Sequence, residues 1–338
     1  MSDLDIKKLE SWAKSRVDGF SGPIEASKIT GGQSNPTYKL RTPSGAYVLR
    51  RKPPGVLLKS AHAVDREFRV QRALADTDVP VPRMYALCED DHVIGSAFYI
   101  MEFLDGIAFD QPALPALPRE ARGAVMEAMN RALVAIHEVD VEAADLTDYG
   151  PPGHYCQRQT DRWTKQYRAT QTEALPDMNA LIDWLQTNMP DDDGQRRLVH
   201  GDFRLDNLLF SADGSDIRAV LDWELSTIGH PYADLAAVIM QWSMPATREG
   251  RGLAGVDRKA EGLWSDTQFI ETYCARRGLS GIDDFNFYLA FSFFRMAAIL
   301  QGVKKRGLDG NAADPDRAVR LGSYVPEFAR AGLSAAQS

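Results

Sequence analysis

The segment 198–222 constrains the fold of this chain more than any other part of it. The first part of the segment, 198–210, ends in an apolar run, and a second apolar run, 217–221, follows after residues that favour turns. Short apolar runs divided by Asp, Gly and Ser predict two antiparallel strands joined by a tight turn. The second run ends directly at Asp222. We therefore expect a β-hairpin with an acidic side chain at its open end.

Three polar side chains are predicted to converge at this open end. If Gly214 and Ser215 are the central residues of a type II′ turn, Asn207 lies opposite Asp222, and Asp202 arrives on the preceding loop. Mg²⁺ prefers carboxylate and amide oxygens and usually takes only one or two protein groups. Asn207 and Asp222 are therefore the candidate metal ligands. Asp202 is the candidate catalytic residue, which would orient a substrate hydroxyl toward the γ-phosphate of ATP. An ordinary hairpin with acidic turn ends is the alternative.

The first hundred residues predict a β-meander with one main helix, whereas the pattern from residue 104 onward is mostly helical apart from the hairpin. We expect an α+β protein with a small N-terminal lobe, 1–103, and a larger C-terminal lobe, 104–338. The expected N-terminal elements are a lead helix over 3–19, strands at 26–30, 37–41, 46–52, 84–88 and 97–103, and a helix from Ser60 to about residue 75.

The third predicted strand and the helix after it suggest an ion pair. Val48 and Arg50 share one face of the strand because side chains alternate. Glu67 falls on the apolar stripe of the helix. Because an unpaired buried charge is costly, we expect Glu67 to pair with Arg50, whose planar guanidinium could also hold phosphates. The alternative is a solvated Glu67 beside the other arginines of the helix.

A glycine-rich turn, Gly31–Pro36, separates the first two predicted strands. Glycine lets the backbone approach a phosphate, and the side chains of Ser34 or Asn35 could donate hydrogen bonds to it. A plain hairpin turn explains the same residues equally simply. The candidate nucleotide-binding residues are Ser34, Asn35, Val48, Arg50, Glu67, Met101, Glu102 and Phe103.

Charge and cysteine content narrow the class of protein. The formal net charge is -8, which disfavours a general surface for nucleic acid. The three cysteines show no metal-type or redox-type spacing, which fits a reducing compartment. No apolar run is long enough for a membrane span, and the first residues lack the core of a signal peptide. We therefore expect a cytoplasmic protein without nucleic-acid or membrane partners.

Together these motifs resemble the aminoglycoside phosphotransferase and choline kinase family, distant relatives of protein kinases. His200–Asp202 with Asn207 resembles the family's catalytic loop, and the strand that ends at Asp222 resembles its metal-binding strand. The segment 229–236 is similar to the one that follows, in which the aspartate matching Asp234 braces the catalytic loop. The resemblance implies a two-lobed protein-kinase-like fold, ATP and Mg²⁺ as cofactors, and a small-molecule hydroxyl as acceptor. It also implies that His200 and Asp234 support the catalytic loop.

Within that family, the run 47–55 and the helix around Asp65–Glu67 are most similar to the kinase-like domain that is fused to acyl-CoA dehydrogenases in animals and free-standing in bacteria. This similarity implies a hydroxylated acyl-CoA as acceptor and a functional link to an acyl-CoA dehydrogenase. Two residues depart from the family pattern. Arg50 stands where many relatives have lysine, and His230, near the expected metal loop, stands where many have aspartate.

The acceptor site is expected on the helical lobe. Tyr155, Arg158 and Arg162 fall near one another at helical spacing and could hold a carboxylate, a CoA phosphate or a thioester. An ordinary amphipathic helix explains the same pattern. Glu224 and Arg295 complete the candidate substrate residues.

Two other functions are weighed against this one. An aminoglycoside kinase would present an acidic pocket to its polycationic substrate, but the acidic run 191–193 beside Pro190 indicates a solvated loop. A nucleotide-binding pseudokinase that regulates a partner would need no Asp202. Both functions are therefore kept as alternatives to a metabolite kinase.

Overall fold

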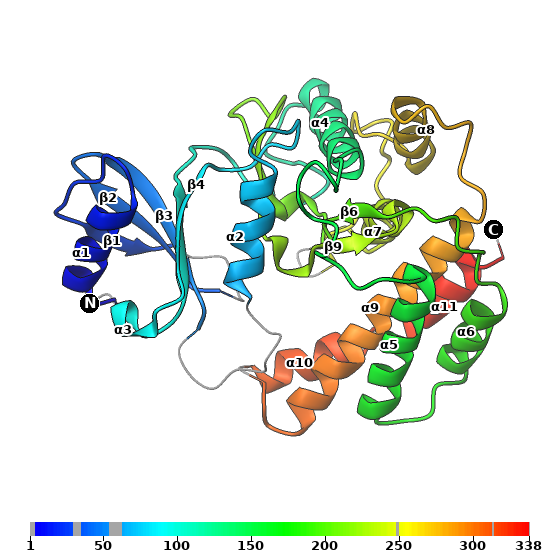
Figure 1. The fold of residues 1–338 in the computed structure, drawn as a ribbon. Helices are drawn as coiled ribbons and strands as arrows, with labels where there is room; N and C mark the ends of the chain where they lie inside the picture. The colour runs from blue at the N-terminus through cyan, green and yellow to red at the C-terminus, as the bar shows by residue number, and fades with distance from the viewer. Residues whose placement is uncertain (1–3, 30–34, 54–62, 248–249, 313, 338) are drawn as a thin grey trace.

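The computed structural model describes residues 4–29, 35–53, 63–247, 250–312 and 314–337. Figure 1 shows a five-stranded sheet with its flanking helices at the N-terminal end, and a larger, mainly helical part that holds the C-terminus. This is the α+β arrangement that the sequence predicts. Among the described residues, no helix is both long and apolar enough to cross a membrane.

The five-stranded sheet is antiparallel throughout, with the strand order β1-β2-β3-β5-β4. All five strands were expected, and their ends differ from the prediction by only one or two residues. The strands are β1 (Glu25–Lys28), β2 (Thr37–Thr42), β3 (Gly45–Arg51), β4 (Met84–Cys88) and β5 (Phe98–Glu102).

Helices cover both faces of this sheet. Side chains of β3 alternate between the faces: Leu49 packs in a hydrophobic cluster with α1 (Ile6–Arg16), whereas Val48 packs with α2 (Val64–Ala73). Arg50 follows Val48 on the α2 side. The sheet thus presents one arginine to the side on which the helical part lies (Figure 1).

Helix α2 starts later than the sequence predicts. Its N-cap is Ala63, which makes no side-chain cap hydrogen bond, and the expected start at Ser60 lies outside the described residues. Asp65 and Glu67 lie in the first turn, where negative charge is favourable at the positive end of the helix dipole. A short helix, α3 (Asp91–Ile94), precedes the last strand of the sheet.

Two hydrophobic cores hold the helical part together. One joins α4, α7 and α8 to the small strands of this part, and the other joins α5, α6, α9 and α11. Helix α9 is the apolar core helix that the sequence predicts, and it contacts α5, α7, α10 and α11. The helices are α4 (Arg119–His137), α5 (Tyr155–Thr170), α6 (Pro176–Thr187), α7 (Pro231–Trp242), α8 (Asp266–Arg276), α9 (Phe285–Leu308), α10 (Pro315–Gly322) and α11 (Val325–Ala335).

Two two-stranded sheets lie in the helical part. They pair β6 (Arg197–Val199) with β9 (Thr227–Gly229) and β7 (Leu208–Phe210) with β8 (Ile217–Val220). The second pair is the predicted hairpin. Because β6 leads into the loop 200–204 and β8 leads into Asp222, these short strands fix where the predicted polar residues lie.

The hairpin register differs from the prediction by one residue. Leu208 pairs with Val220, so that Asn207 lies opposite Leu221, whose N–H donates to the Asn207 carbonyl oxygen at 2.8 Å, and not opposite Asp222. The reason is the connection: the register shifts at a bulge after Leu209, and the loop 211–216 is longer than a two-residue turn. Asn207 and Asp222 still share the open end of the hairpin.

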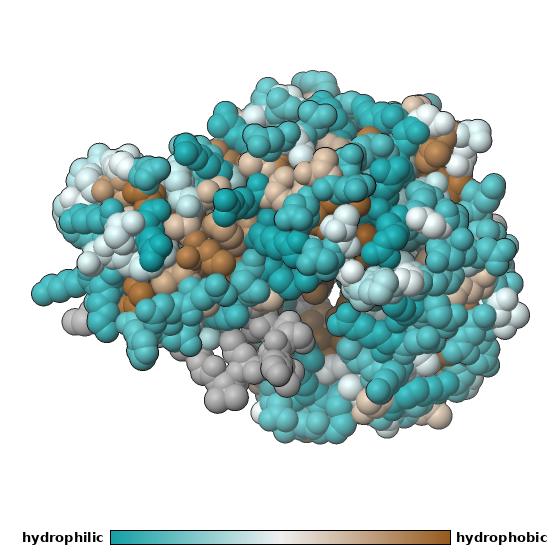
Figure 2. All heavy atoms as spheres, in the orientation of Figure 1, coloured by the Kyte–Doolittle hydropathy of each residue, from teal (hydrophilic) through white to brown (hydrophobic). Residues whose placement is uncertain are grey.

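Hydrophilic residues cover most of the face shown in Figure 2. Hydrophobic residues gather on the side of the five-stranded sheet that is turned toward the helical part. Part of the apolar surface visible on this face therefore lies near the junction of the two parts.

Candidate active site

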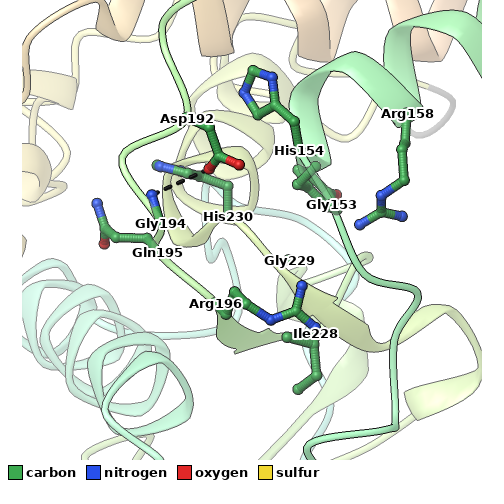
Figure 3. Close-up of a pocket in the computed structure, with 11 residues that line it drawn as sticks. Gly153, His154, Arg158, Asp192, Gly194, Gln195, Arg196, Ile228, Gly229 and His230 are labelled. Carbon is green, nitrogen blue, oxygen red and sulfur yellow. Dashed lines mark hydrogen bonds between the residues drawn. The ribbon is translucent and has the colours of Figure 1, made fainter.

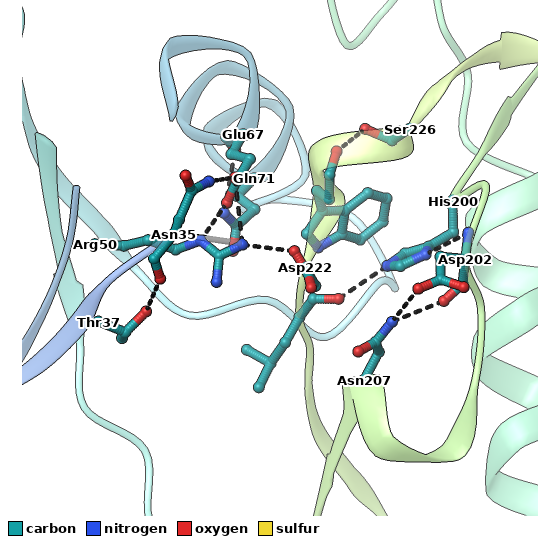
Figure 4. A network of polar contacts seen from close by, with 12 residues as sticks. Asn35, Thr37, Arg50, Glu67, Gln71, His200, Asp202, Asn207, Asp222 and Ser226 are labelled. Carbon is teal, nitrogen blue, oxygen red and sulfur yellow. Dashed lines mark hydrogen bonds and ion pairs between the residues drawn. The ribbon is translucent and has the colours of Figure 1, made fainter. Parts of the chain in front are cut away.

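Asp202 and Asn207 are held together by the loop between β6 and β7. Asn207 ends a 3-10 helix, Leu205–Asn207, which turns its side chain back toward the loop. Its Nδ2 donates to the backbone oxygen of Asp202 at 2.9 Å and to Asp202 Oδ2 at 3.1 Å (Figure 4). The Asp202 side chain is 34% exposed, and Arg204 Nε lies 3.3 Å from its Oδ1. A substrate hydroxyl could therefore reach a carboxylate whose orientation is already fixed.

Asp234 holds the loop between β6 and β7 in place through its carboxylate. Its carboxylate accepts hydrogen bonds from the backbone N–H of His200 at 2.5 Å and of Gly201 at 2.9 Å. Gly201 has φ of +79°, and a Cβ there would lie 2.5 Å from the Leu225 carbonyl oxygen, so that only glycine fits this turn. The contacts that His200 and Asp234 were predicted to make with the loop are present.

His200 also ties the catalytic loop to the strand that carries Asp222. Its Nε2 lies 2.9 Å from the carbonyl oxygen of Leu221, and its Nδ1 accepts the N–H of Asp202 at 3.3 Å. These bonds assign the ring proton to Nε2, which donates to the carbonyl. Asp202 and Asp222 are therefore positioned relative to one another by a single imidazole.

His137, which the sequence did not single out, lies behind Asp234. It is fully buried at the end of α4, with Nε2 3.6 Å from Asp234 Oδ2 and Nδ1 2.7 Å from the Tyr273 hydroxyl. Burial opposes ionisation of Asp234, yet His137, His200 and the Gly201 N–H together hold its pKa below the usual range. Burial lowers the pKa of His137 itself, against the influence of Asp234. The sequence around His137 shows only an apolar helical pattern, which does not predict that its side chain reaches Asp234.

Arg50 joins the two parts of the molecule at Asp222. Its Nε lies 2.8 Å from Glu67 Oε2, which is the ion pair predicted from strand alternation and the helix stripe. Its Nη2 lies 2.5 Å from Asp222 Oδ1 (Figure 4). Burial alone would lower the pKa of Arg50, but Glu67 and Asp222 raise it above the ordinary value. The arginine therefore stays charged.

Glu67 is almost completely buried and is held by neutral donors as well as by Arg50. Asn35 Nδ2 donates to Oε1 at 2.8 Å and the Tyr99 hydroxyl donates to Oε2 at 3.0 Å. Burial raises the pKa of Glu67, against the opposite effect of Arg50. Where we expected Asn35 to donate to a phosphate, the structure places its amide on Glu67. The other predicted donor of that turn, Ser34, lies outside the described residues.

The donor set at Asp222 fits a magnesium ion. Glu67, Asp222 and Glu224 each offer a carboxylate oxygen, and these three oxygens lie within 4.8 Å of one another. Asn207 lies at the same open end of the hairpin, and its Nδ2 donates to Asp202. The amide oxygen of Asn207 is the atom that could bind a metal ion. Mg²⁺ prefers hard oxygen donors and usually takes only one or two protein groups, so the residues present are sufficient to hold it. Glu224, predicted as a substrate residue, lies in this carboxylate cluster.

The remaining nucleotide candidates lie on β3 and at the end of β5. Val48 pairs directly with Met101, and both belong to the apolar cluster under α2. Glu102 Oε2 accepts the N–H of Arg83 at 3.2 Å, and Lys39 Nζ lies 3.3 Å from the centre of the Phe103 ring. Val48 and Met101 thus lie on neighbouring strands, and Val48 is two residues before Arg50 on β3.

The structure separates the predicted substrate residues into two groups. Arg295 donates to the Gly201 carbonyl oxygen at 2.7 Å, so it borders the catalytic loop. Arg162 is exposed, and its guanidinium and that of Arg295 both approach the Trp163 ring.

Tyr155 and Arg158 form the second group. Tyr155 packs under Gly229, where burial raises its pKa to about 12. Tyr155 and Arg158 both line a separate cavity with His230. His230, expected near the metal loop, caps α7 and contacts Asp193 and Tyr288. Asp193 is thus paired and not only solvated.

Curated proteins similar to this chain are longer than it is. Acyl-CoA dehydrogenase family member 10 of Mus musculus is 47% identical over 309 residues, which cover 90% of this chain and 29% of that protein. Acyl-CoA dehydrogenase family member 11 of Homo sapiens is 40% identical over 335 residues, which cover 98% of this chain and 43% of that protein. The chain spans less than half the length of these relatives.

Solved structures share the fold. A protein from Ralstonia eutropha, described as a candidate aminoglycoside phosphotransferase, is 46% identical with a TM-score of 0.91 and covers 99% of this chain and 98% of its own. A thermostable variant of aminoglycoside phosphotransferase APH(4)-Ia, solved with AMP-PNP and hygromycin B, is 18% identical with a TM-score of 0.63, covering 96% of this chain and 99% of its own. The fold is therefore the two-lobed kinase-like fold that the sequence motifs imply.

The model of the phosphotransferase enzyme family, APH, matches residues 25–270. That range runs from β1 into α8 and includes the catalytic loop, the hairpin and the Arg50–Glu67 pair. With most of its length matched, the chain belongs to the phosphotransferase enzyme family.

Proposed function

We propose that this protein transfers the γ-phosphate of ATP to a hydroxyl group of a small molecule. The observation that carries the proposal is the convergence of Asp202, Asn207 and Asp222 on one hairpin end, facing the Arg50–Glu67 pair. A phosphotransferase of this kind needs a positioned carboxylate, hard oxygen ligands and a fixed cation near the phosphates. The site supplies all three.

In this mechanism Asp202 accepts a hydrogen bond from the acceptor hydroxyl and directs its oxygen at the γ-phosphorus. As the new O–P bond forms and the bond to the leaving ADP oxygen breaks, the hydroxyl proton passes to the Asp202 carboxylate. A loose transition state requires little proton abstraction early on, so orientation is the main contribution of Asp202. Asn207 and Asp234 keep the carboxylate and its loop in place.

Nucleotide binding is assigned to the opposite wall. Val48, Met101, Glu102 and Phe103 would border the base, and Arg50 would contact the phosphates. Asn207 and Asp222 would hold Mg²⁺, which neutralises phosphate charge when it is bound. The boundary between the two lobes would follow Phe103, where β5 has just ended.

The acceptor we propose is a hydroxylated acyl-CoA. The support is the similarity to acyl-CoA dehydrogenase family members 10 and 11, which also suggests a functional link to a dehydrogenase. Aminoglycosides are the second candidate, because APH(4)-Ia with hygromycin B shares the fold. Residues expected at the acceptor side are Arg295, Arg162 and Trp163, which lie beside the catalytic loop or stack together on α5 and α9.

An ATP-consumption screen tests this proposal. Purified protein with Mg-ATP is offered hydroxyacyl-CoAs, amino alcohols, sugars and aminoglycosides, and we expect hydroxyacyl-CoAs to stimulate ADP formation most. The matched control is the same acyl-CoA without its hydroxyl, which should not stimulate. Preference for aminoglycosides would refute the proposed acceptor. Tight nucleotide binding with no stimulation by any hydroxyl compound would favour the regulatory pseudokinase over the enzyme.

A further inference from the structure

A cavity of about 100 Å³ lies in the helical part, away from the site described above. Arg196 and Gly229 line it at the end of the β6–β9 pair where Arg197 is opposite Gly229. His200 and the catalytic loop follow the other end of β6. At about 3.3 Å per residue, the three residues of β6 separate the cavity from the loop by about 10 Å. The cavity is therefore distinct from the proposed phosphate-donor site.

Two arginines face this cavity. Figure 3 shows the guanidinium groups of Arg158, from α5, and Arg196, from the loop before β6, directed into the same space. Neither forms an ion pair with any residue that the structure describes, and within that part of the chain the buried Nε of Arg158 has no hydrogen-bond partner. Burial, together with the charge of Arg196, lowers the pKa of Arg158. Two like charges that face one another repel, and an anion bound between them would turn this repulsion into attraction.

The start of helix α5 adds further donors. Tyr155, the first residue of this 16-residue helix, lines the cavity with His154, whose side chain makes no cap hydrogen bond. The first N–H groups of a helix lack intrahelical partners, and the helix dipole makes this end attractive to anions. The donors of the helix thus complement the two arginine side chains.

Nearby acidic groups are already engaged. Asp192 lines the cavity, but its carboxylate accepts the backbone N–H of Gly194 at 3.1 Å within its own loop (Figure 3). Asp193 lies 3.4 Å from His230 Nε2, and the Tyr288 hydroxyl lies 3.2 Å from the same nitrogen. Neither carboxylate forms an ion pair with Arg158 or Arg196, so both guanidinium groups can still take another anion as their partner.

The size of the cavity restricts its ligand. Its volume of about 100 Å³ is small, because sites for whole drug-sized ligands span about 300–1,000 Å³. A single small group fits, and arginine forks match the oxygens of phosphate. We propose that this cavity binds a phosphate group, held by Arg158, Arg196 and the N-terminus of α5. The phosphate is either a free ion or, if the proposed function holds, a remote phosphate of the acceptor.

Calorimetric titration with inorganic phosphate tests the proposal. The protein is first saturated with Mg-ADP so that the donor site is filled. We expect the wild-type protein to bind phosphate, and the variants Arg158→Gln and Arg196→Gln to bind it at least about tenfold more weakly, since each loses a charged, two-pronged donor. Arg197→Gln is the matched control, because Arg197 is adjacent in sequence but does not line the cavity, and it should bind as the wild type does.

Two outcomes would overturn the proposal. One is equal phosphate affinity in the wild-type protein and both cavity variants, with circular dichroism showing that all are folded. The other is phosphate binding that disappears when Mg-ADP is present, which would place the anion at the donor site. Neither outcome depends on phosphoryl transfer. The phosphate site can therefore be refuted without refuting the proposed phosphotransferase function, and the reverse also holds.

Coenzyme A distinguishes the two sources of the phosphate. If an acyl-CoA acceptor carries it, coenzyme A displaces inorganic phosphate, and 3′-dephospho-coenzyme A does so at least about tenfold more weakly for want of one charged group. If the ligand is the free ion, neither compound displaces it. Both results support a phosphate site, and they assign its ligand.

Discussion

Replacing Asp202 with asparagine is expected to slow phosphoryl transfer by about 10²–10⁴-fold, the usual contribution of a positioned proton acceptor. Asparagine keeps an oxygen that can accept the hydrogen bond from Asn207 Nδ2, so the loop should retain its shape. It cannot take up the hydroxyl proton. Steady-state kinetics with an acceptor from the screen measures the rate, and calorimetry with Mg-ADP should show unchanged nucleotide affinity.

Asp213→Asn is the matched control for this variant. Asp213 lies in the loop between β7 and β8, is exposed, and bonds only its neighbours Ser211 and Ser215 among the residues described. The same change from carboxylate to amide should leave the transfer rate unaltered there. Undiminished transfer by Asp202→Asn would remove Asp202 from its assigned role.

Arg50→Met is expected to lower the free energy of unfolding by about 3–5 kcal/mol at neutral pH, because it leaves a buried charge without its partner. Glu67 is 1% exposed and would keep only the neutral donors Asn35 and Tyr99. Asp222 would lose its ion pair at the same time. Arg50→Lys, which retains a positive charge, should cost less. Denaturant unfolding curves measure these differences.

The loss in Arg50→Met should grow as the pH rises. Burial raises the pKa of Glu67 and Arg50 counteracts this, so removing Arg50 raises the pKa of Glu67 further. A carboxyl group whose pKa is raised by folding binds a proton more readily in the folded state, so stability falls as the pH rises from the unfolded value of about 4.3 toward the raised one. The deficit should therefore be smaller near pH 5 than near pH 8.

Arg51→Met provides the control for this pH dependence. Arg51 is 2% exposed and its Nε donates to the Ser96 hydroxyl at 3.0 Å, a neutral partner. Any loss of stability in Arg51→Met should be the same near pH 5 and near pH 8. An Arg50→Met deficit that did not change with pH would show that Glu67 is not the group whose ionisation Arg50 supports.

Local periodicity explains why the Arg50–Glu67 pair could be predicted. Alternation along β3 puts Arg50 on the face of Val48, and the helical stripe of α2 puts Glu67 on its buried side. Both are properties of short segments. The fold class followed in the same way, since the β-rich and helical stretches are continuous in the chain. The hairpin motif then placed Asp202, Asn207 and Asp222 together.

Features that depend on loops or on distant contacts could not be predicted in this way. The hairpin register was wrong by one residue because turn composition does not specify the bulge at Leu209 or the longer loop. His137 reaches Asp234 only through the packing of α4 near α7. Arg158 and Arg196 line the same cavity because Tyr155, at the start of α5, lies against Gly229 of β9, which is paired with β6. No local pattern encodes this contact.

Asn207 and Asp222 are proposed to form a magnesium-dependent nucleotide site beside Asp202. Calorimetric titration with AMP-PNP, with and without Mg²⁺, tests it most directly, because no acceptor is required. We expect Mg²⁺ to strengthen binding to the wild-type protein, and Asn207→Ala and Asp222→Ala each to lose at least about 10–100-fold in affinity for Mg-AMP-PNP, as loss of groups at metal sites commonly does. If Asp222→Ala bound Mg-AMP-PNP as tightly as the wild-type protein does, the proposed magnesium site at Asp222 would be contradicted.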